Sequence, residues 1–323
     1  MTQVTAKGLV EVFQQSGAGF ARDKVPKMSA ALAYYAIFSL GPMLMVIIFT
    51  TALLWQQQAV EGSLYGQIKE LLGDEVALQV QEIIKNAALH GHNTLNAFIG
   101  IATLLVAATG LFAEMQDSIN TIWQLRIRED AGWRYLLKTR VTSFLLIISL
   151  GFLLIVSLVI SGVVEGLMGK LQELFPGPTV ILVYAANLLV TLLITTVLFA
   201  IIYKVLPDAI IRWKDVAVGA LFTAVLFMVG KFGITLYLTR SNVGSAYGVA
   251  GSLVVLLLFI YYSTILLYLG AEFTKYYVLK YGIEIRPVKA AVLVQTVQVK
   301  SKAASLQANE ETRVIAESPT QKQ

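Results

Sequence analysis

The chain has 323 residues, of which 57% are hydrophobic and only 14% are charged, and its net charge is +5. Because soluble domains carry roughly 25% charged residues, this composition excludes an ordinary water-soluble fold. The chain has no cysteine, which excludes disulfides, thiolate catalysis and cysteine-ligated zinc sites.

Long stretches without Asp, Glu, Lys or Arg mark the membrane spans. A bilayer core about 30 Å thick needs about 20 apolar residues in a helix. Five stretches are long enough and carry no charged residue, and a sixth is interrupted only by Lys231. We therefore predict an all-α membrane protein, a bundle of six transmembrane helices. The predicted spans are residues 29–54, 95–115, 141–163, 179–203, 216–238 and 247–271.

The segments outside and between the spans of the membrane domain, residues 29–280, differ in pattern. Apolar residues spaced among polar ones in residues 1–28 favour a cytoplasmic arm with a short interfacial helix. In the first outer loop, residues 55–94, apolar residues recur at three- and four-residue steps, which predicts amphipathic helices. The cytoplasmic tail, residues 281–323, lacks the apolar surface that would offset the entropy of ordering, so we expect it to be disordered. Its valine-rich part, residues 292–299, is the one stretch able to pair as a strand.

The basic residues set the orientation of the chain. Translocation across the membrane disfavours Lys and Arg close to span ends. Of the 25 basic residues, 20 fall in the N-terminal arm, the second loop, the fourth loop and the tail, so we predict that both termini are cytoplasmic. Basic cytoplasmic loops attract anionic lipid, which explains the net charge without a nucleic-acid partner, and no nucleic-acid-binding motif is present. The expected partners are therefore the lipid bilayer and its anionic lipids.

Three segments resemble a known family. They are SAALAYYAIFSLGPMLMVI at 29–47, TGLFAEMQDSINTIW at 109–123 and YGVAGSLVVLLLFIYYSTILLYLGAEFTKYY at 247–277. They are similar to the YihY/BrkB family of bacterial inner-membrane proteins, and the resemblance keeps the family's order from about residue 20 to 280. It implies a six-helix protein of the bacterial plasma membrane with both ends inside. Some members carry a mistaken label as ribonuclease BN, and others are linked to serum resistance or envelope lipid handling.

The ribonuclease label gains no support from the residues. A metal-dependent nuclease needs three or four converging ligands. The two histidines, His90 and His92, stand two residues apart in the outer loop, where solvated side chains are favoured over a metal site. No convergent nucleophile and base is recognisable either. We therefore predict no enzyme, no metal and no cofactor.

Polar side chains inside the spans are candidates for a substrate path. A cation such as Lys231 is expensive within a membrane and is a functional candidate, with snorkelling or structural pairing as the alternative. Polar residues at four-residue steps share one stripe of a helix, where hydrogen bonds between helices are the alternative to a hydrated cavity. A proline bends the first span near two tyrosines. The candidate path comprises Tyr34, Tyr35, Pro42, Asn187, Thr191, Thr195, Thr223, Lys231 and Thr235.

Polar residues near the cytoplasmic ends of the second and sixth spans form a candidate inner gate. Its members are Asp117, Asn120 and Glu272, and Glu272 precedes Lys275 by three residues. The alternative interpretation is a set of helix-end ion pairs beside an interfacial tryptophan, Trp123.

These features favour a transporter or exporter of an envelope-related or anionic metabolite. A small-molecule substrate is then a further partner, although the residues do not identify it. The chain has no Gly-rich nucleotide-binding loop with its Lys-Ser/Thr end, so ATP would be used by another protein. A non-transporting scaffold for envelope assembly is the alternative, and the oligomeric state is left open.

Overall fold

The structure, a computed structural model, describes residues 5–54, 110–128, 178–240, 250–282 and 284–294. It also describes residues 65, 66, 69, 77, 78, 81, 130, 132, 135, 141, 149 and 247. Side chains are described at all of these positions except 40–54, 178–184, 235, 238 and 239. Apart from isolated positions, the predicted outer-loop helices in 55–94 and the predicted span 141–163 lie outside the described residues, as does most of the span 95–115.

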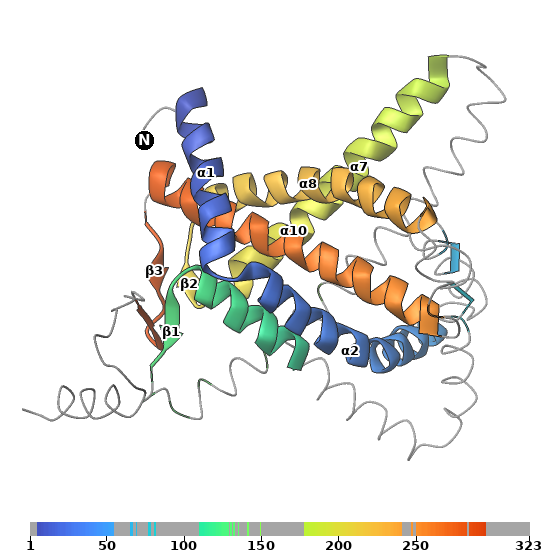
Figure 1. Cartoon of the computed structure of the whole chain (residues 1–323), viewed down its shortest axis with the longest axis horizontal. Helices are drawn as coiled ribbons and strands as arrows, with labels where there is room; N and C mark the ends of the chain where they lie inside the picture. Colours follow the sequence, from blue (N-terminus) through green and yellow to red (C-terminus); the bar gives the residue numbers. More distant parts are fainter. Residues whose placement is uncertain are drawn as a thin grey trace, which may run out of the picture. The chain divides into compact units, whose positions relative to one another are not determined.

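Helices dominate the described part of the chain (Figure 1). The labelled helices are α1 (Ala6–Arg22), α2 (Val25–Leu54), α7 (Pro178–Val205), α8 (Trp213–Arg240) and α10 (Gly251–Tyr281). A further helix covers residues 110–122. The helix α10 packs against α1, α2 and α8, and α7 packs against α8.

Three helices among the described residues are long and apolar enough to cross a membrane. They are Ala185–Val205 in α7, Trp213–Ile234 in α8, and Gly251–Tyr281, which is the whole of α10. These three coincide with the last three predicted spans, and the first predicted span lies within α2. The prediction of a helical multi-pass membrane protein is confirmed to this extent.

The N-terminal arm forms the amphipathic helix α1. Thr5 caps its start, because the Thr5 side chain accepts a hydrogen bond of 3.2 Å from the backbone N–H of Gly8. The helix ends at Arg22, and two residues later Lys24 adopts a left-handed backbone with φ of 53°, which turns the chain into α2. The buried face of α1 lies against α10 and carries mostly small residues.

Two short antiparallel ladders join segments that are distant in the sequence. The strand β1 (Leu125–Ile127) pairs with β4 (Ala291–Leu293), and β2 (Ala209–Ile210) pairs with β3 (Arg286–Pro287). The strands gather at one end of the helices (Figure 1). The segments that follow residue 124, the turn after α7 and residues 286–293 therefore lie at one end of the helices.

The ladders also correct one expectation. Residues 281–323 are predicted to be disordered, yet residues 286–287 and 291–293 form β3 and β4. Their backbone groups pair with the loops between spans, and Ala291 is only 5% exposed, so tertiary contacts order a segment whose composition alone would not. Residues 295–323 lie outside the described residues.

The helices α8 and α10 contact each other at a five-residue sequence that occurs, with one difference, once in each helix. It reads GALFT at 219–223 in α8 and GAEFT at 270–274 in α10. A Cβ atom on Gly219 would lie 1.9 Å from Oγ1 of Thr274, and a Cβ atom on Gly270 would lie 1.9 Å from Oγ1 of Thr223. Each glycine thus faces the threonine of the other helix. The helices run antiparallel, and the contact has an approximate local two-fold symmetry.

Side chains around this crossing complete the symmetry. The rings of Phe222 and Phe273 stack with their centroids 4.0 Å apart. Each threonine hydroxyl donates to the glycine carbonyl of its own helix, from Thr223 over 2.8 Å and from Thr274 over 2.7 Å. Tyr203 of α7 reaches the same contact, because its hydroxyl donates to the carbonyl of Leu267 in α10 over 2.6 Å. Small residues therefore allow the helices to approach closely, and large apolar side chains such as Phe222, Phe273 and Phe199 pack around the contact.

A buried aspartate ties the turn after α7 to the helix over residues 110–122. Asp208 is 8% exposed, and its Oδ2 atom accepts hydrogen bonds from Gln116 (3.0 Å), Asn120 (2.8 Å) and Tyr135 (2.7 Å). Its backbone N–H donates to Oδ1 of Asn120 over 2.9 Å, and its carbonyl accepts from the N–H of Val288 over 3.1 Å. This junction fixes β2 and β3 relative to the helix that precedes β1.

We expect Gly219→Ala to destabilise the protein. The new methyl group would collide with Thr274, and overpacking of this kind costs about 1–3 kcal/mol. Gly233→Ala is the matched control in the same helix, since nothing lies within 4 Å of its Cβ position, and it should leave the stability unchanged or raise it by up to about 1 kcal/mol. Thermal unfolding of the purified protein in detergent measures both, and equal melting temperatures would contradict the crossing.

We expect Asp208→Asn to destabilise the protein by about 1–3 kcal/mol, because the neutral amide oxygen is a weaker acceptor than the carboxylate oxygen on which three hydrogen bonds converge. Asp130→Asn is the control. The side chain of Asp130 is 67% exposed and pairs with an exposed Arg128, so its change should stay within about 0.5 kcal/mol. The same unfolding measurement compares the two. An unchanged melting temperature in Asp208→Asn would show that the hydrogen bonds of Asp208 do not stabilise the protein.

Candidate functional site

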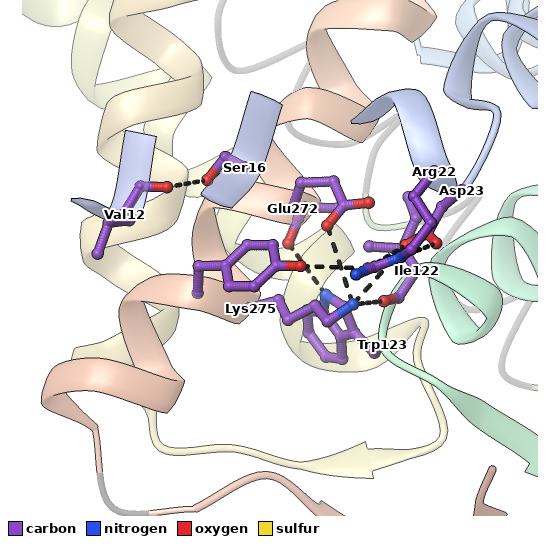
Figure 2. Close-up of polar contacts among 10 residues, drawn as sticks. Val12, Ser16, Arg22, Asp23, Ile122, Trp123, Glu272 and Lys275 are labelled. Carbon is purple, nitrogen blue, oxygen red and sulfur yellow. Dashed lines mark hydrogen bonds and ion pairs between the residues drawn. The ribbon is translucent and has the colours of Figure 1, made fainter. Parts of the chain in front are cut away.

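Four charged side chains meet where the ends of α1 and of the helix over residues 110–122 reach α10 (Figure 2). They are Arg22, Asp23, Glu272 and Lys275, and we call them the charged cluster. Glu272 is fully buried, and Lys275 is only 4% exposed. Ionised groups are rarely buried so completely without a function or a full set of partners.

Lys275 lies at the centre of the charged cluster. Its Nζ atom donates to the carbonyl of Ile122 over 2.5 Å, and it lies 3.7 Å from Oδ2 of Asp23 and 3.9 Å from Oε2 of Glu272. Ile122 ends the helix over residues 110–122, where carbonyls have no partner within the helix and attract cations. Trp123 adds a second link, because its ring N–H donates to the carbonyl of Ala271 over 3.1 Å. The lysine therefore joins three elements.

Arg22 and Asp23 form a two-point ion pair at the end of α1. The Nε atom of Arg22 donates to Asp23 over 2.9 Å and Nη2 over 3.2 Å, while Nη2 also donates to the hydroxyl of Tyr276 over 3.1 Å. Burial alone would raise the pKa of the Asp23 carboxyl, but the hydrogen bonds from Arg22 and the charge of Lys275 lower it overall. The hydrogen bond with Asp23 raises the pKa of Arg22. Both side chains are therefore ionised at neutral pH.

Glu272 differs from the other members because it has no hydrogen bond. Neither of its oxygens accepts a hydrogen bond from a described residue, but the carboxyl of Asp23 is close enough to share one when one of the two carboxyl groups carries a proton. Gly19 of α1 covers it so closely that a Cβ atom there would lie 2.5 Å from Oε2. Most buried polar groups are hydrogen-bonded, so a buried carboxyl whose described partner is an ammonium group 3.9 Å away is a candidate functional group.

The three predicted gate residues do not meet in one place. Glu272 belongs to the charged cluster, whereas Asn120 is buried against Asp208 and Asp117 is exposed. Trp123, which the alternative interpretation places at the membrane interface, is only 3% exposed and packs inside.

The predicted path residues have diverse surroundings. Thr223 is fully buried, and its Oγ1 atom lies 3.1 Å from the hydroxyl of Tyr203, so it serves the contact between helices. Tyr34 and Tyr35 are exposed, and their rings meet edge to face. Asn187, Thr195 and Lys231 are half-buried, and Thr191 is exposed. The side chains of Pro42 and Thr235 lie outside the described residues, as do His90, His92 and the rest of their loop segment.

Sequence patterns did not identify several residues of the site. Arg22 and Asp23 look like part of a solvated turn between basic residues, and Gly19 carries no side chain to notice. The repeated pentapeptide is the signal that points to the site. Its two copies differ only at the third position, which is Leu221 in α8 and Glu272 in α10.

Sequence comparison places the chain among known membrane proteins. A family model described as Virulence factor BrkB matches residues 17–292. A UPF0761 membrane protein of Pseudoalteromonas atlantica is 27% identical over 78% of this chain and 81% of its own length. A second, from Tolumonas auensis, is 27% identical over 78% of this chain and 80% of its own length.

A third relative, the UPF0761 membrane protein RSc1559 of Ralstonia nicotianae, is 28% identical over 77% of this chain and 54% of its own length. No solved structure matches the chain. Because the family model covers most of the sequence, including all four residues of the charged cluster, the chain belongs to the Virulence factor BrkB family of membrane proteins.

Proposed function

We propose that this protein is a transporter or exporter that moves an anionic or envelope-related metabolite across the bacterial plasma membrane, with the charged cluster as its inner gate. The observation that carries the proposal is Glu272, a fully buried carboxyl without a hydrogen bond at the end of a membrane helix. A purely structural role would favour an apolar or fully paired residue at such a position.

Two further polar groups extend the site along α10 and α2. The hydroxyl of Tyr268, one helical turn before Glu272, is buried, and its polar neighbour is the side chain of Ser118. The hydroxyl of Ser29 in α2 is buried without a hydrogen-bond partner among the described residues. Buried polar groups that lack a protein partner usually bind water. This supports a hydrated path that leads to Glu272 and Lys275.

The cations of the charged cluster fit an anionic substrate. Lys275 has a single close oxygen partner, the carbonyl of Ile122, and its two carboxylate neighbours lie beyond 3.5 Å. An anion that enters the site would compete with these carboxylates for the ammonium group. The ion pairs of Lys275 with Asp23 and Glu272 would then close the gate, and the gate would open when the anionic substrate replaces these carboxylates beside Lys275.

The proposed topology has six spans with both termini in the cytoplasm. It is supported by the basic residues of the loops and by the ladders that hold the second loop, the fourth loop and the tail at one end.

We expect a fluorescent protein fused to either terminus to mature in the cytoplasm, and alkaline phosphatase at the C-terminus to be inactive. Alkaline phosphatase inserted within residues 55–94 should be active, because that loop lies outside in the proposed topology. Fluorescence and phosphatase activity of intact cells measure the result. An active phosphatase at the C-terminus would contradict the orientation, and termini on opposite faces would contradict the even number of spans.

The absence of native cysteine allows a direct test of the hydrated path. Ser29→Cys is nearly isosteric, and we expect water-soluble methanethiosulfonate reagents to modify it in native membranes. Ala224→Cys is the control, since Ala224 is equally buried but lies in the apolar core of α8. Mass spectrometry compares the two rates. If both cysteines stay unmodified, the path is wrong and the alternative of a non-transporting scaffold for envelope assembly gains support.

A further inference from the structure

We propose that Glu272 is a proton-binding site and that α1 is a movable cover over it, so that the gate takes up and releases a proton. The coupling of this proton to a substrate rests on the proposed transport function, whereas proton binding by the carboxyl does not. Three independent observations support the site.

The first observation comes from the two-fold crossing of α8 and α10. Glu272 occupies the position that Leu221 occupies in the other copy of the pentapeptide. Leu221 is 46% exposed, whereas Glu272 is fully buried. The crossing itself therefore needs neither a carboxyl nor burial at this position. The carboxyl and its burial are therefore features of α10 that α8 lacks, and the helix that buries this position of α10 is α1.

The second observation is that α1 covers Glu272 without binding it. Gly19 presents only backbone to the carboxyl, and a Cβ atom there would collide with it at 2.5 Å. The hydroxyl of Ser16, on the same face of α1, donates to the carbonyl of Val12 over 2.7 Å and leaves the carboxyl alone (Figure 2). The part of α1 that lies over the carboxyl therefore forms no hydrogen bond with it, whereas the contacts that hold α1 lie along the rest of the helix, in the ion pair of Glu11 with Lys280 and the packing of Phe13 against Phe273.

The third observation is the balance of charges around the carboxyl. The groups that surround it are Lys275 on α10, 3.9 Å away, Asp23 after α1 and Arg22 at the end of α1. The helix over residues 110–122 contributes only the carbonyl of Ile122, which Lys275 occupies. Arg22 is paired with Asp23, so Lys275 is the cation that remains for Glu272.

These surroundings have opposite effects on the protonation of Glu272. Burial favours the protonated, neutral carboxyl, whereas the ammonium group of Lys275 favours the ionised form. Gly19 and Arg22 belong to α1, and Asp23 lies in the turn that follows it. Movement of α1 therefore changes both the burial of Glu272 and the charges around it. Protonation of Glu272 would leave Lys275 with less counter-charge and therefore ready for an anion. Release of the proton would restore the internal ion pair.

Dicyclohexylcarbodiimide tests the site on the full-length protein in detergent or nanodiscs. The reagent adds to protonated carboxyls in apolar surroundings, and mass spectrometry locates the adduct. We expect Glu272 to be modified, with a rate that falls as the pH rises, and we expect Glu272→Gln to abolish the adduct. Asp208 and Asp215 are internal controls, because both are buried carboxylates with hydrogen bonds and should stay unmodified.

Two glycine variants test the cover. Gly19→Ala should prevent close seating of α1 and increase the rate of modification several-fold, whereas Gly17→Ala on the same helix has nothing within 4 Å and should not change it. Lys275→Met should extend modification to higher pH, because it removes the cation that favours the ionised form.

The outcomes separate the two proposals. No adduct at Glu272 at any pH, either in the wild type or in Gly19→Ala, overturns the proton site, even if Ser29→Cys proves accessible and the path stands. A pH-dependent adduct with an inaccessible Ser29→Cys confirms the proton site and rejects the transport path. Equal rates in Gly19→Ala and Gly17→Ala reject α1 as the cover.

Discussion

Gly219 and Gly270 allow the backbones of α8 and α10 to touch, and the positions of the neighbouring groups depend on this contact. Each threonine hydroxyl is satisfied within its own helix, so the crossing stays free of unpaired polar groups. The hydroxyl of Tyr203 then attaches α7 to the same pair. Since the crossing fixes the face of α10 that meets α8, it also leaves Glu272 on a face where, among the described residues, Gly19 of α1 lies against it. Helix packing and the location of the charged cluster thus have one cause.

Lys275 concentrates several charged and polar contacts on one ammonium group. Taking a cation and two carboxylates out of water costs several kcal/mol for each ion, and attraction between them offsets this only when the geometry is close. The pair of Arg22 and Asp23 meets that condition, but the pair of Lys275 and Glu272 does not, because their 3.9 Å separation leaves the carboxyl without a hydrogen bond. Stability alone would have replaced this pair, which is why a function is the better explanation for it.

The sequence alone predicted where the helices lie, but it did not predict which segments pair or pack with each other. Gaps between charged residues located α7, α8 and α10, because a bilayer imposes length and composition locally. The ladder between β1 and β4 depends on residues more than 160 positions apart, which no local pattern contains. Asp117 and Asn120 illustrate the limit for the site. Three residues along a helix leave the two side chains about 60° apart around the axis. At the edge of the buried face this difference separates an exposed Asp117 from Asn120, which reaches Asp208.

The N-terminal arm packs against the charged cluster, so in the proposed mechanism it belongs to the gate. The end of α1, the end of the helix over residues 110–122 and α10 all meet at Lys275. Binding equilibria are reciprocal, so a ligand that binds Lys275 more tightly when α1 is displaced must itself favour the displaced state. Asp23 supplies this link, because it follows α1 and competes with any anion for the same ammonium group. Gly19 keeps the competition reversible, since its contact with Glu272 adds proximity without a bond that would have to be broken.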